Sequence, residues 1–363
     1  MTIDEKLTLI GQVGEEIITE MDLKKLLETE ESIVTYDGFE PSGQMHIAQG
    51  ILRTINVNKM IKAGFTFKML VADWHGYLNN KMGGDLEKIK TVGNYFIEIW
   101  KVAGMDLDHV EFVWASDLVK DPKYWELVMK IAKTNAIRRF IRAAEIIGRE
   151  ESMDLTLAQL MYIAMQAADV FTLGARVTQL GMDQRKVNMI AREVAHQLGY
   201  EKPVVISHHM LMSLGQPPAE TDDKTNRTIQ LKMSKSKPDT AIFMTDSKED
   251  IERKIAKAWC PEGVITENPI LEYFKYIIFE SFDKLGIKSL VIERPEKFGG
   301  SLTVSSYEEL EKKFAEKQIH PTDLKNTIVP LIDKLLQPVR AHFETDTSAK
   351  ELLKQVQSFA VTR

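Results

Sequence analysis

Strand and helix signals alternate through the first two-thirds of the chain. Residues 33–39 read as a strand that runs into a Pro-Ser-Gly turn, and residues 47–63 follow with the apolar spacing of a helix. A second strand over 65–72 ends in the unbroken apolar run Met69 to Ala72, which is typical of a strand covered on both faces. This alternation predicts an α/β fold with a doubly wound parallel sheet, in which ligands bind beyond the carboxyl ends of the strands.

The pattern changes at about residue 245, after which helices dominate. Helical patterns are expected before this point at 122–149, 155–171 and 182–198, and after it at 270–282, 307–317, 322–336 and 347–359. A chain of 363 residues is too long for one simple core. We expect an N-terminal helical segment (1–30), a Rossmann-like domain (31–245) with a connective insertion at about 115–155, and an all-helical C-terminal domain (246–363).

Composition argues against several kinds of site. The single cysteine, Cys260, cannot form an intrachain disulfide, and the eight scattered histidines do not suggest a structural metal. No apolar run is long enough to span a membrane, and residues 1–14 lack a signal sequence, which favours the cytoplasm. The net charge of −6 argues against a chain coated by nucleic acid, although Arg138, Arg139 and Arg142 form a local basic cluster.

A strand, a small-residue turn and a helix start come together in residues 38–50, which read Gly-Phe-Glu-Pro-Ser-Gly-Gln-Met-His-Ile-Ala-Gln-Gly. The chain has no Walker phosphate loop and no Gly-x-Gly-x-x-Gly fingerprint, so it would have to bind a nucleotide in another way. Backbone N–H groups at a helix N-terminus can face phosphates, and small residues let the backbone approach them. His46 can add a donor there, although a lone histidine beside a turn is more often structural.

A polar stretch over 215–239 contains the pentapeptide Lys-Met-Ser-Lys-Ser at 232–236. Loops of this length are usually functional or disordered. Two ammonium groups and two hydroxyls in a flexible loop suit a clamp on a pyrophosphate leaving group, where charge builds up in the transition state. The pentapeptide alone could be a chance basic loop, but its place far downstream of the 38–50 motif, beyond an alternating α/β pattern, is hard to explain by chance.

The two motifs together resemble the signatures of class I aminoacyl-tRNA synthetases. The resemblance covers nearly the whole chain and is closest to tyrosyl-tRNA synthetases of archaeal and eukaryotic type. The segments that carry it are 36–43, 72–78, Tyr162 with Gln166 and Asp169, 181–186 and 294–300. The chain departs from the family's pattern at Ala48 and Gln49, which stand where the first signature has Gly and a second His, and at Arg176, where archaeal relatives have Asp.

The resemblance implies a catalytic Rossmann-like domain, an anticodon-binding helical domain, and ATP with Mg²⁺ as a substrate complex without a protein-bound structural metal. The implied catalytic residues are His46, Gln49, Lys232 and Lys235. The residues expected around ATP are Gly38, Ser42, Gly43, His46, Lys232, Met233, Ser234, Lys235 and Ser236. Little acid–base chemistry is needed, because positioning and charge neutralisation supply most of the rate when a carboxylate attacks the α-phosphate.

Three polar residues, Tyr162, Gln166 and Asp169, lie at i, i+4 and i+7, so one helix face presents them all. An exposed polar stripe is the plain alternative, but the flanking residues are apolar, which indicates a buried helix whose polar groups need partners. In the family that this chain resembles, Tyr36 and Asp169 bind the phenol hydroxyl of L-tyrosine. Tyr162, Gln166 and Gln184 bind its amino group.

His75 is expected to line the pocket floor, and a core histidine is about as plausible. A phenylalanine ring would leave Tyr36 and Asp169 unpaired in an apolar pocket, so the pair favours tyrosine. The indole N–H of tryptophan also needs an acceptor, so Asp169 alone does not exclude a tryptophan–tRNA ligase. A catalytically silent tRNA-binding paralogue is a third possibility, because synthetase-like folds are reused and Gln49 departs from the signature.

The remaining expectations concern tRNA(Tyr) and a partner subunit. The resemblance implies that Phe298 stacks on an anticodon base and that Asp323, near His320, reads its edge, as in single-strand RNA recognition. Asp323 or Thr322 could instead merely cap the helix after Pro321. The residues expected near the acceptor end are Arg142, Arg185 and Lys186. The family also implies a homodimer packed through residues 110–150.

Overall fold

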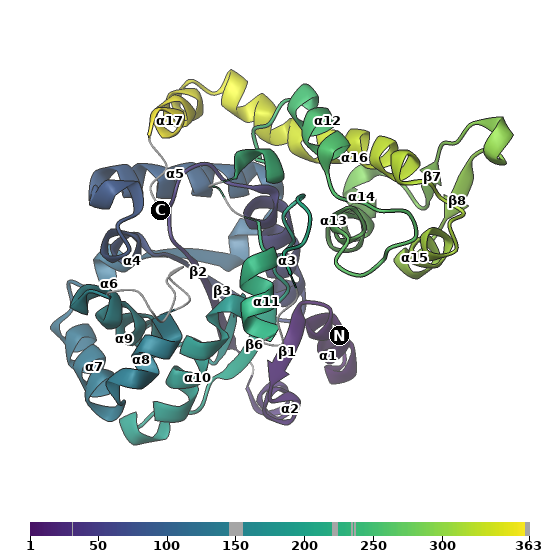
Figure 1. Ribbon diagram of the computed structural model, residues 1–363. Coiled ribbons are helices and arrows are strands. Elements are labelled where there is room, and N and C mark those ends of the chain that lie inside the picture. Colours follow the sequence, from purple (N-terminus) through teal and green to yellow (C-terminus); the bar gives the residue numbers. More distant parts are fainter. Residues whose placement is uncertain (31, 145–154, 220–223, 234, 236, 360–363) are drawn as a thin grey trace.

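The computed structural model describes residues 1–30, 32–144, 155–219, 224–233, 235 and 237–359. Its centre is a six-stranded sheet in the order β1-β6-β5-β2-β3-β4 (Figure 1). The strands are β1 (Gly14–Ile18), β2 (Ile33–Phe39), β3 (Phe65–Val71), β4 (Val110–Trp114), β5 (Val177–Gly181) and β6 (Val204–His208). The order reverses beside β2, which is the place where doubly wound sheets bind ligands.

The predicted parallel sheet is confirmed for five of these strands. β2 pairs in parallel with β3 from Ile33 opposite Phe65 to Phe39 opposite Val71, and the β3–β4, β2–β5 and β5–β6 pairs are also parallel. β1 runs antiparallel to β6 at the edge. The segment 1–30 was expected to be helical only, and β1 corrects this. No residue of this edge strand is fully buried, so its sequence Gly-Glu-Glu-Ile-Ile needs no alternation of apolar and polar residues. The strand therefore gives no periodic signal from which it could be predicted.

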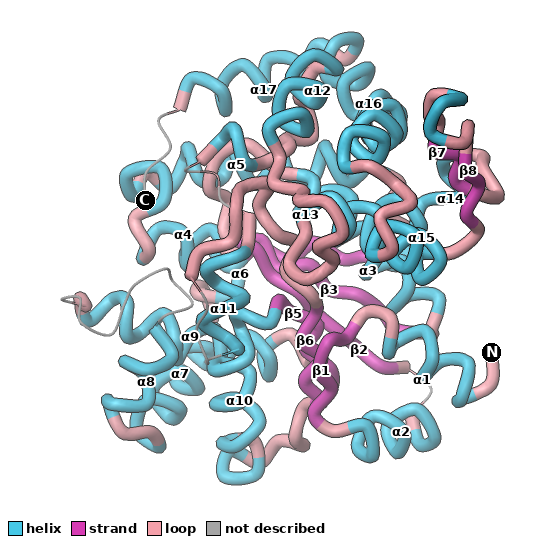
Figure 2. The backbone as a smooth tube through the Cα atoms, turned by 45° about the vertical axis from the view of Figure 1, so that its right-hand side comes forward, coloured by secondary structure: helices cyan, strands magenta, loops and turns pink. Residues whose placement is uncertain are grey.

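Helices cover both faces of the sheet and divide the apolar side chains into two cores (Figure 2). On one face lie α1 (Ile3–Gly11), α2 (Glu20–Thr29), α3 (Arg53–Lys62) and α5 (Leu86–Ala103). The other face carries α7 (Pro122–Thr134), α8 (Ile137–Ala143), α9 (Leu157–Thr172) and α10 (Arg185–Val194). Three short helices complete this part of the chain: α4 (Asp73–Leu78), α6 (Ala115–Leu118) and α11 (Lys224–Leu231). None of the helices in the described ranges is long and apolar enough to cross a membrane.

The helix expected over 122–149 is two helices. Asn135 and Ala136 adopt extended backbone angles (φ/ψ of −123°/138° and −67°/142°), and these angles separate α7 from α8. Residues 145–154 lie outside the described part of the chain, so the last turns of this prediction stay untested.

The C-terminal region is mainly helical, as expected, but it is not all-helical. Its helices are α12 (Lys248–Lys257), α13 (Pro269–Tyr273), α14 (Phe282–Leu285), α15 (Tyr307–Ala315), α16 (Pro321–Thr345) and α17 (Thr347–Ser358). Two short strands, β7 (Leu290–Ile292) and β8 (Leu302–Val304), form an antiparallel pair that projects at one end of the region in Figure 1. Strands of three residues are too short to give a periodic signal in the sequence.

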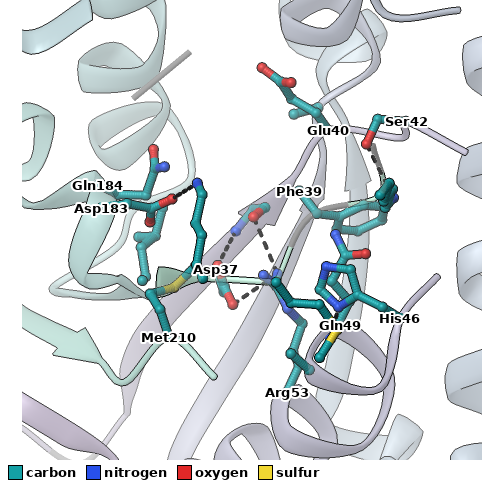
Figure 3. A pocket seen from close by; sticks show the side chains of 18 of the residues that line it. Asp37, Phe39, Glu40, Ser42, His46, Gln49, Arg53, Asp183, Gln184 and Met210 are labelled. Carbon is teal, nitrogen blue, oxygen red and sulfur yellow. Dashed lines mark hydrogen bonds and ion pairs between the residues drawn. The ribbon is translucent and has the colours of Figure 1, made fainter. Parts of the chain in front are cut away.

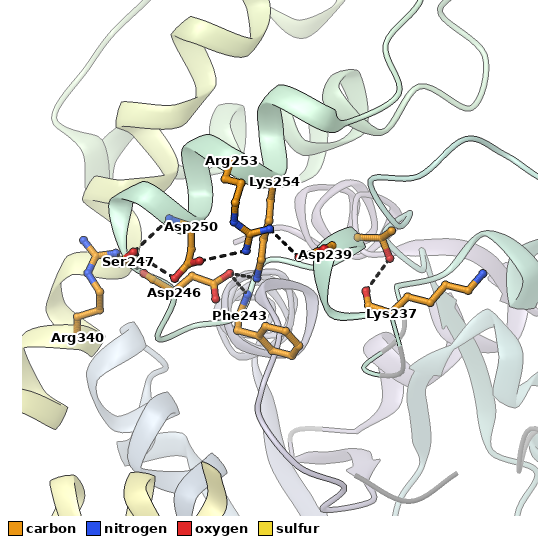
Figure 4. Close-up of polar contacts among 10 residues, drawn as sticks. Lys237, Asp239, Phe243, Asp246, Ser247, Asp250, Arg253, Lys254 and Arg340 are labelled. Atoms are coloured by element: carbon orange, nitrogen blue, oxygen red, sulfur yellow. Dashed lines mark hydrogen bonds and ion pairs between the residues drawn. The ribbon is translucent and has the colours of Figure 1, made fainter. Parts of the chain in front are cut away.

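A buried ion pair anchors the chain where it leaves the sheet for the helical region (Figure 4). The Asp246 carboxylate accepts hydrogen bonds from the Phe243 backbone at 2.8 Å and from Lys254 at 2.5 Å. Arg340 of α16 donates to the Asp246 carbonyl at 3.1 Å. Phe243 in turn forms a backbone bridge with His46. This junction therefore connects the helical region to the Pro-Ser-Gly turn.

Candidate active site

A cavity of ≈ 1040 Å³ opens at the carboxyl ends of β2, β5 and β6. Most of the predicted site residues line it, although they come from distant parts of the chain (Figure 3). They are Tyr36, Gly38, Ser42, His46, Gln49, His75, Tyr162, Gln166, Asp169, Gln184, Lys232, Met233 and Lys235. Gly43 does not line the cavity, and Ser234 and Ser236 lie outside the described residues.

The turn after β2 brings the backbone close to the chain behind it. Gly43 has φ 102°, which L side chains rarely adopt, and a Cβ on Gly50 would lie 2.2 Å from Met244 Sδ. The predicted helix begins here as a π-helical turn, η1 (Ala48–Leu52). The N–H groups of Ile47, Gln49 and Gly50 are already bonded within the chain. These three N–H groups are therefore not free for the backbone anion site expected at this helix start, whereas His46 and Gln49 line the cavity.

His46 is held neutral beside this turn. Burial, followed by the positive charges of Lys235 and Arg53, lowers the pKa of His46 well below its ordinary value. Its Nδ1 lies 3.4 Å from the Gln49 backbone N–H, so this nitrogen acts as the acceptor and the proton is assigned to Nε2. A neutral His46 can therefore donate one hydrogen bond into the cavity.

Gln49 replaces the second histidine of the signature. Its backbone is held by a hydrogen bond, and its side chain can bind a ligand. Its carbonyl accepts from Trp100 Nε1 at 2.9 Å. Its Oε1 is buried and has no hydrogen-bond partner within the described chain. A buried amide oxygen of this kind needs a partner, which a bound substrate can supply.

The two lysines of the loop approach the cavity from different sides. Lys232 donates to Asp183 Oδ2 at 2.7 Å, and Lys235 donates to Ser42 Oγ at 3.1 Å. Burial raises the pKa of Asp183, but Lys232, with smaller contributions from Gln184 and His208, brings the net pKa below its ordinary value, so the carboxylate stays charged. Burial and then Lys81 lower the pKa of Lys235 well below its usual range. A bound anionic ligand would raise the pKa of Lys235 again, because a nearby negative charge stabilises the ammonium form.

A second ion pair, which sequence reasoning missed, braces the end of β2. Arg53 lies 2.9 Å from Asp37 Oδ2 and also donates to the Gly38 carbonyl at 3.2 Å. Burial raises the pKa of Asp37 to about 6, although Arg53 opposes this shift. The pair holds Gly38 rigidly at the cavity wall.

The opposite end of the cavity is closed by a buried carboxylate. Asp169 Oδ1 accepts from the Tyr124 hydroxyl at 2.8 Å, and Oδ2 lies 3.0 Å from His75 Nε2. Burial lowers the pKa of His75, but the charge and hydrogen bond of Asp169, together with the charges of Glu40 and Asp73, raise it above its ordinary value. The Tyr36 hydroxyl is buried in the same region with no hydrogen-bond partner among the described residues. His75 is therefore buried, but it contacts Asp169 and lines the cavity, as expected of a residue at the pocket floor.

The remaining predicted residues form the wall between the two ends. Tyr162 packs edge-on against the His75 ring, with centroids 5.0 Å apart, and burial raises the pKa of its hydroxyl well above the ordinary value. Gln166 Nε2 donates to Gln184 Oε1 at 3.0 Å, while Gln166 Oε1 is buried without a partner in the described ranges. Figure 3 shows Gln184 beside Asp183 on the side of the pocket opposite Ser42, His46 and Gln49. Amide groups from α9 and from the 3-10 turn after β5, η5 (Met182–Gln184), therefore meet at the wall of the cavity.

The residues predicted to contact tRNA lie outside this cavity. Arg142 is exposed on α8, Lys186 lies on α10, and Arg185 is paired with Glu16 of β1. Phe298, 62% exposed, lies between β7 and β8.

Neither Asp323 nor Thr322 caps the start of α16, as the alternative interpretation had it. The N-cap residue is His320, whose imidazole accepts a hydrogen bond from the Thr322 backbone N–H.

Arg176, for which the sequence offered no role, has one in the structure. Its guanidinium lies 2.7 Å from Glu30 Oε1, and its backbone N–H donates to the Val34 carbonyl. The side chain thus ties the end of α2 to the loop before β5. It does not line the cavity.

A family model and two curated relatives point to the same protein family. The family model described as "tRNA synthetases class I (W and Y)" matches residues 28–337. The chain is 48% identical to "Tyrosine--tRNA ligase 1, cytoplasmic" of Arabidopsis thaliana over 99% of its own length and 90% of that protein. It is 41% identical to the tyrosine–tRNA ligase of Saccharolobus islandicus over the full length of both. The chain belongs to the tyrosyl-tRNA synthetases.

The fold of this synthetase is also similar to that of a solved tyrosyl-tRNA synthetase. The tyrosyl-tRNA synthetase of Pyrococcus horikoshii, complexed with L-tyrosine, matches with a TM-score of 0.89 at 37% identity, over 98% of this chain and 100% of that one. The resemblance inferred from the motifs is thereby confirmed, together with the class I fold.

Proposed function

We propose that this synthetase activates L-tyrosine with ATP and transfers it to the 3′ end of tRNA(Tyr). The observation that carries the proposal is the closed end of the cavity, where the unpartnered Tyr36 hydroxyl and the Asp169 carboxylate are both buried. A phenol hydroxyl can accept from Tyr36 and donate to Asp169 at once. The carboxylate has about four acceptor sites, so Tyr124 and His75 leave room for a third donor.

The same geometry disfavours the alternative amino acids. The indole N–H of tryptophan is a donor only, so it could satisfy Asp169 but would leave the Tyr36 hydroxyl without an acceptor. Phenylalanine would satisfy neither group, and each unsatisfied buried group costs about 1–3 kcal/mol. Tyrosine is therefore the amino acid that completes this pocket.

The other end of the cavity suits the nucleotide. A neutral His46 and the amide of Gln49 offer hydrogen bonds, while Lys232 and Lys235 supply positive charge where pyrophosphate would leave. Charge placed where it develops in the transition state lowers the barrier without proton transfer. The tyrosine carboxylate can then attack the α-phosphate, held in line by the two ends of one cavity.

Mg²⁺ is proposed to arrive with ATP. The described residues contain no group of three or more His, Cys, Asp or Glu that could hold a metal ion. The carboxylates that line the phosphate end of the cavity, Asp37, Glu40 and Asp183, are each paired with a cationic side chain, which fits an ion coordinated chiefly by the nucleotide. Bound there, the ion would neutralise charge on the phosphates.

The pocket assignment is tested with Asp169→Asn, which keeps the shape of the side chain but replaces an acceptor oxygen with an N–H donor. Tyrosine-dependent ATP–pyrophosphate exchange should fall strongly, because the new amide faces the donors of Tyr124 and His75. Unchanged exchange with tyrosine would refute the assignment. Binding of ATP alone, measured by calorimetry, serves as the control and should stay as in the wild type.

The proposal extends to tRNA and to a second subunit. Phe298 is exposed, which supports its proposed stacking on an unpaired anticodon base. His320 and Asp323 at the start of α16 are proposed to read that base, and Arg142, Arg185 and Lys186 to contact the acceptor end.

For the homodimer, residues 110–150 include the exposed apolar side chains Met129 and Ile137, which a subunit interface would cover. Sedimentation should give a dimer. We place the protein in the cytoplasm, as the name of the Arabidopsis relative states for that protein.

A further inference from the structure

The backbone that supports the lysine loop is a short segment after β6. Met212 and Lys232 form an antiparallel bridge. The Met233 N–H donates to the Leu211 carbonyl at 3.1 Å, and the Ser213 N–H donates to the Leu231 carbonyl at 2.9 Å. Any movement of the segment 211–213 therefore moves the backbone of Lys232 with it.

This segment is itself held by a carboxylate from the helical region. Glu272 on α13 accepts from the Met212 N–H at 2.9 Å with Oε2, and the same oxygen lies 3.0 Å from His209 Nε2. The side chains of Glu272 and His209 are both only 18% exposed. The His209 ring stacks on Tyr276, with centroids 4.1 Å apart. One oxygen thus contacts both His209 and Met212, which belong to a longer segment, 209–213, that includes residues 211–213.

The contact is charge-assisted at neutral pH. Burial lowers the pKa of His209, but Glu15 of β1 and Glu272 raise it to about 9, so the imidazolium persists. The neighbouring His208 behaves in the opposite way, because burial lowers its pKa to about 3. Hydrogen bonds to a charged partner are roughly twice as strong as neutral ones.

The base of α13 is rigid as well. Asn268 caps this helix by accepting from the backbone of Ile270 and Leu271, and the Glu272 N–H donates to the Asn268 carbonyl. Glu272 therefore projects from a fixed helix end onto the segment. None of the predicted site residues plays this part, and nothing in the lysine pentapeptide indicates it.

We propose that Glu272 is a positioning residue for the activation step: it holds the 209–213 segment and, through it, sets the place of Lys232 over the cavity. The inference rests on the proposed function and deepens it, because it makes the helical region part of the machinery that orients the leaving group. A displacement of about 1 Å at a positioned group can cost about 100-fold in rate. Glu272 touches no substrate.

The test compares Glu272→Ala and Glu272→Gln with a matched control. Glu280 is a second carboxylate of the helical region that pairs across to the sheet domain, with Lys59 of α3 at 2.7 Å, but it does not touch the 209–213 segment. Glu280→Gln therefore removes an interface ion pair without releasing the lysine loop. The readouts are kcat of tyrosine-dependent ATP–pyrophosphate exchange and, separately, the Kd of tyrosine by titration.

We expect kcat to fall by about 10- to 100-fold in Glu272→Ala and by less in Glu272→Gln, whose amide oxygen still accepts from Met212. The Kd of tyrosine should stay as in the wild type, because the closed end of the cavity is untouched. The alkaline limb of the kcat profile should move to lower pH in Glu272→Gln, because His209 then keeps only Glu15 as a carboxylate partner. Glu280→Gln should keep wild-type kcat.

Wild-type kcat in Glu272→Gln and Glu272→Ala would overturn the proposal, and so would an equal loss in Glu280→Gln. If Glu272→Ala does not fold, Glu272→Gln decides, because it keeps the shape and the backbone contact. An absence of exchange in the wild-type protein would instead refute the proposed function, so the two failures are distinguishable.

Discussion

Removal of one oxygen atom, in Tyr36→Phe, should stabilise the free protein and weaken its activity at the same time. Tyr36 on β2 is 1% exposed, and its hydroxyl has no hydrogen-bond partner in the part of the chain that the structure describes. Leaving such a group buried costs about 1–3 kcal/mol. Its removal should therefore raise the free energy of unfolding by about 1 kcal/mol, which corresponds to about 1 °C in Tm for a chain of this size.

The opposite sign is expected once tyrosine is bound. The hydroxyl then gains its partner, and a hydrogen bond of this kind contributes about 0.5–1.5 kcal/mol. Its loss should lower kcat/KM for tyrosine by about 2- to 13-fold. Activation of phenylalanine should not fall, because that ring offers no oxygen to Tyr36, so the discrimination between the two amino acids narrows.

The assay is thermal unfolding without ligands, followed by ATP–pyrophosphate exchange with tyrosine and with phenylalanine. Tyr273→Phe is the matched control, because the Tyr273 hydroxyl is likewise buried without a partner among the described residues but does not line the cavity. It should raise Tm without changing exchange. A Tyr36→Phe protein that is less stable than the wild type and equally active on tyrosine would refute the reasoning.

Three further substitutions test other parts of the account. Lys235→Met should lower kcat of exchange by about 10²- to 10³-fold, because a charge at the leaving group is lost, while the Kd of tyrosine stays constant; a change confined to that Kd would contradict this. Phe298→Ala should lower kcat/KM for tRNA by about 5- to 150-fold, the equivalent of about 1–3 kcal/mol of base stacking, and leave exchange unaltered, whereas unchanged tRNA charging would exclude stacking. Lys254→Met should lower the free energy of unfolding by about 3–5 kcal/mol, because Asp246 is left buried and unpaired. The exposed Arg253→Met on the same helix is its control in thermal melting, and equal effects would argue against the buried pair.

The site residues that could be predicted from the sequence are those that belong to short local motifs. His46 and Lys232 were recognised because each stands in a short pattern with a typical place in the chain, and Tyr162, Gln166 and Asp169 because helical spacing puts them on one face. The alternation of strands and helices was sufficient for the parallel sheet. These signals are local, so they can be recognised in the sequence without knowledge of the tertiary structure.

The residues that were missed act through contacts between distant segments. Tyr124 binds Asp169 from 45 residues away, and Asp183 binds Lys232 from 49 residues away. Tyr124 looks in sequence like any apolar residue of an amphipathic helix. Glu272 similarly has no motif around it. Such partners become visible only when packing brings two elements together.

The edge strand β1 and the hairpin β7–β8 were missed for a related reason. Both are short, and their pairing is decided by a neighbour rather than by their own side-chain pattern. The break between α7 and α8 at Asn135 carries no Gly or Pro that would mark it in the sequence.

The specificity of the cavity for tyrosine can be measured by ATP–pyrophosphate exchange of the purified protein with tyrosine, tryptophan and phenylalanine in parallel. We expect rapid exchange with tyrosine and exchange lower by orders of magnitude with the other two, because only a phenol satisfies Tyr36 and Asp169 together. An absence of exchange with tyrosine, or equal exchange with tryptophan, would contradict this expectation.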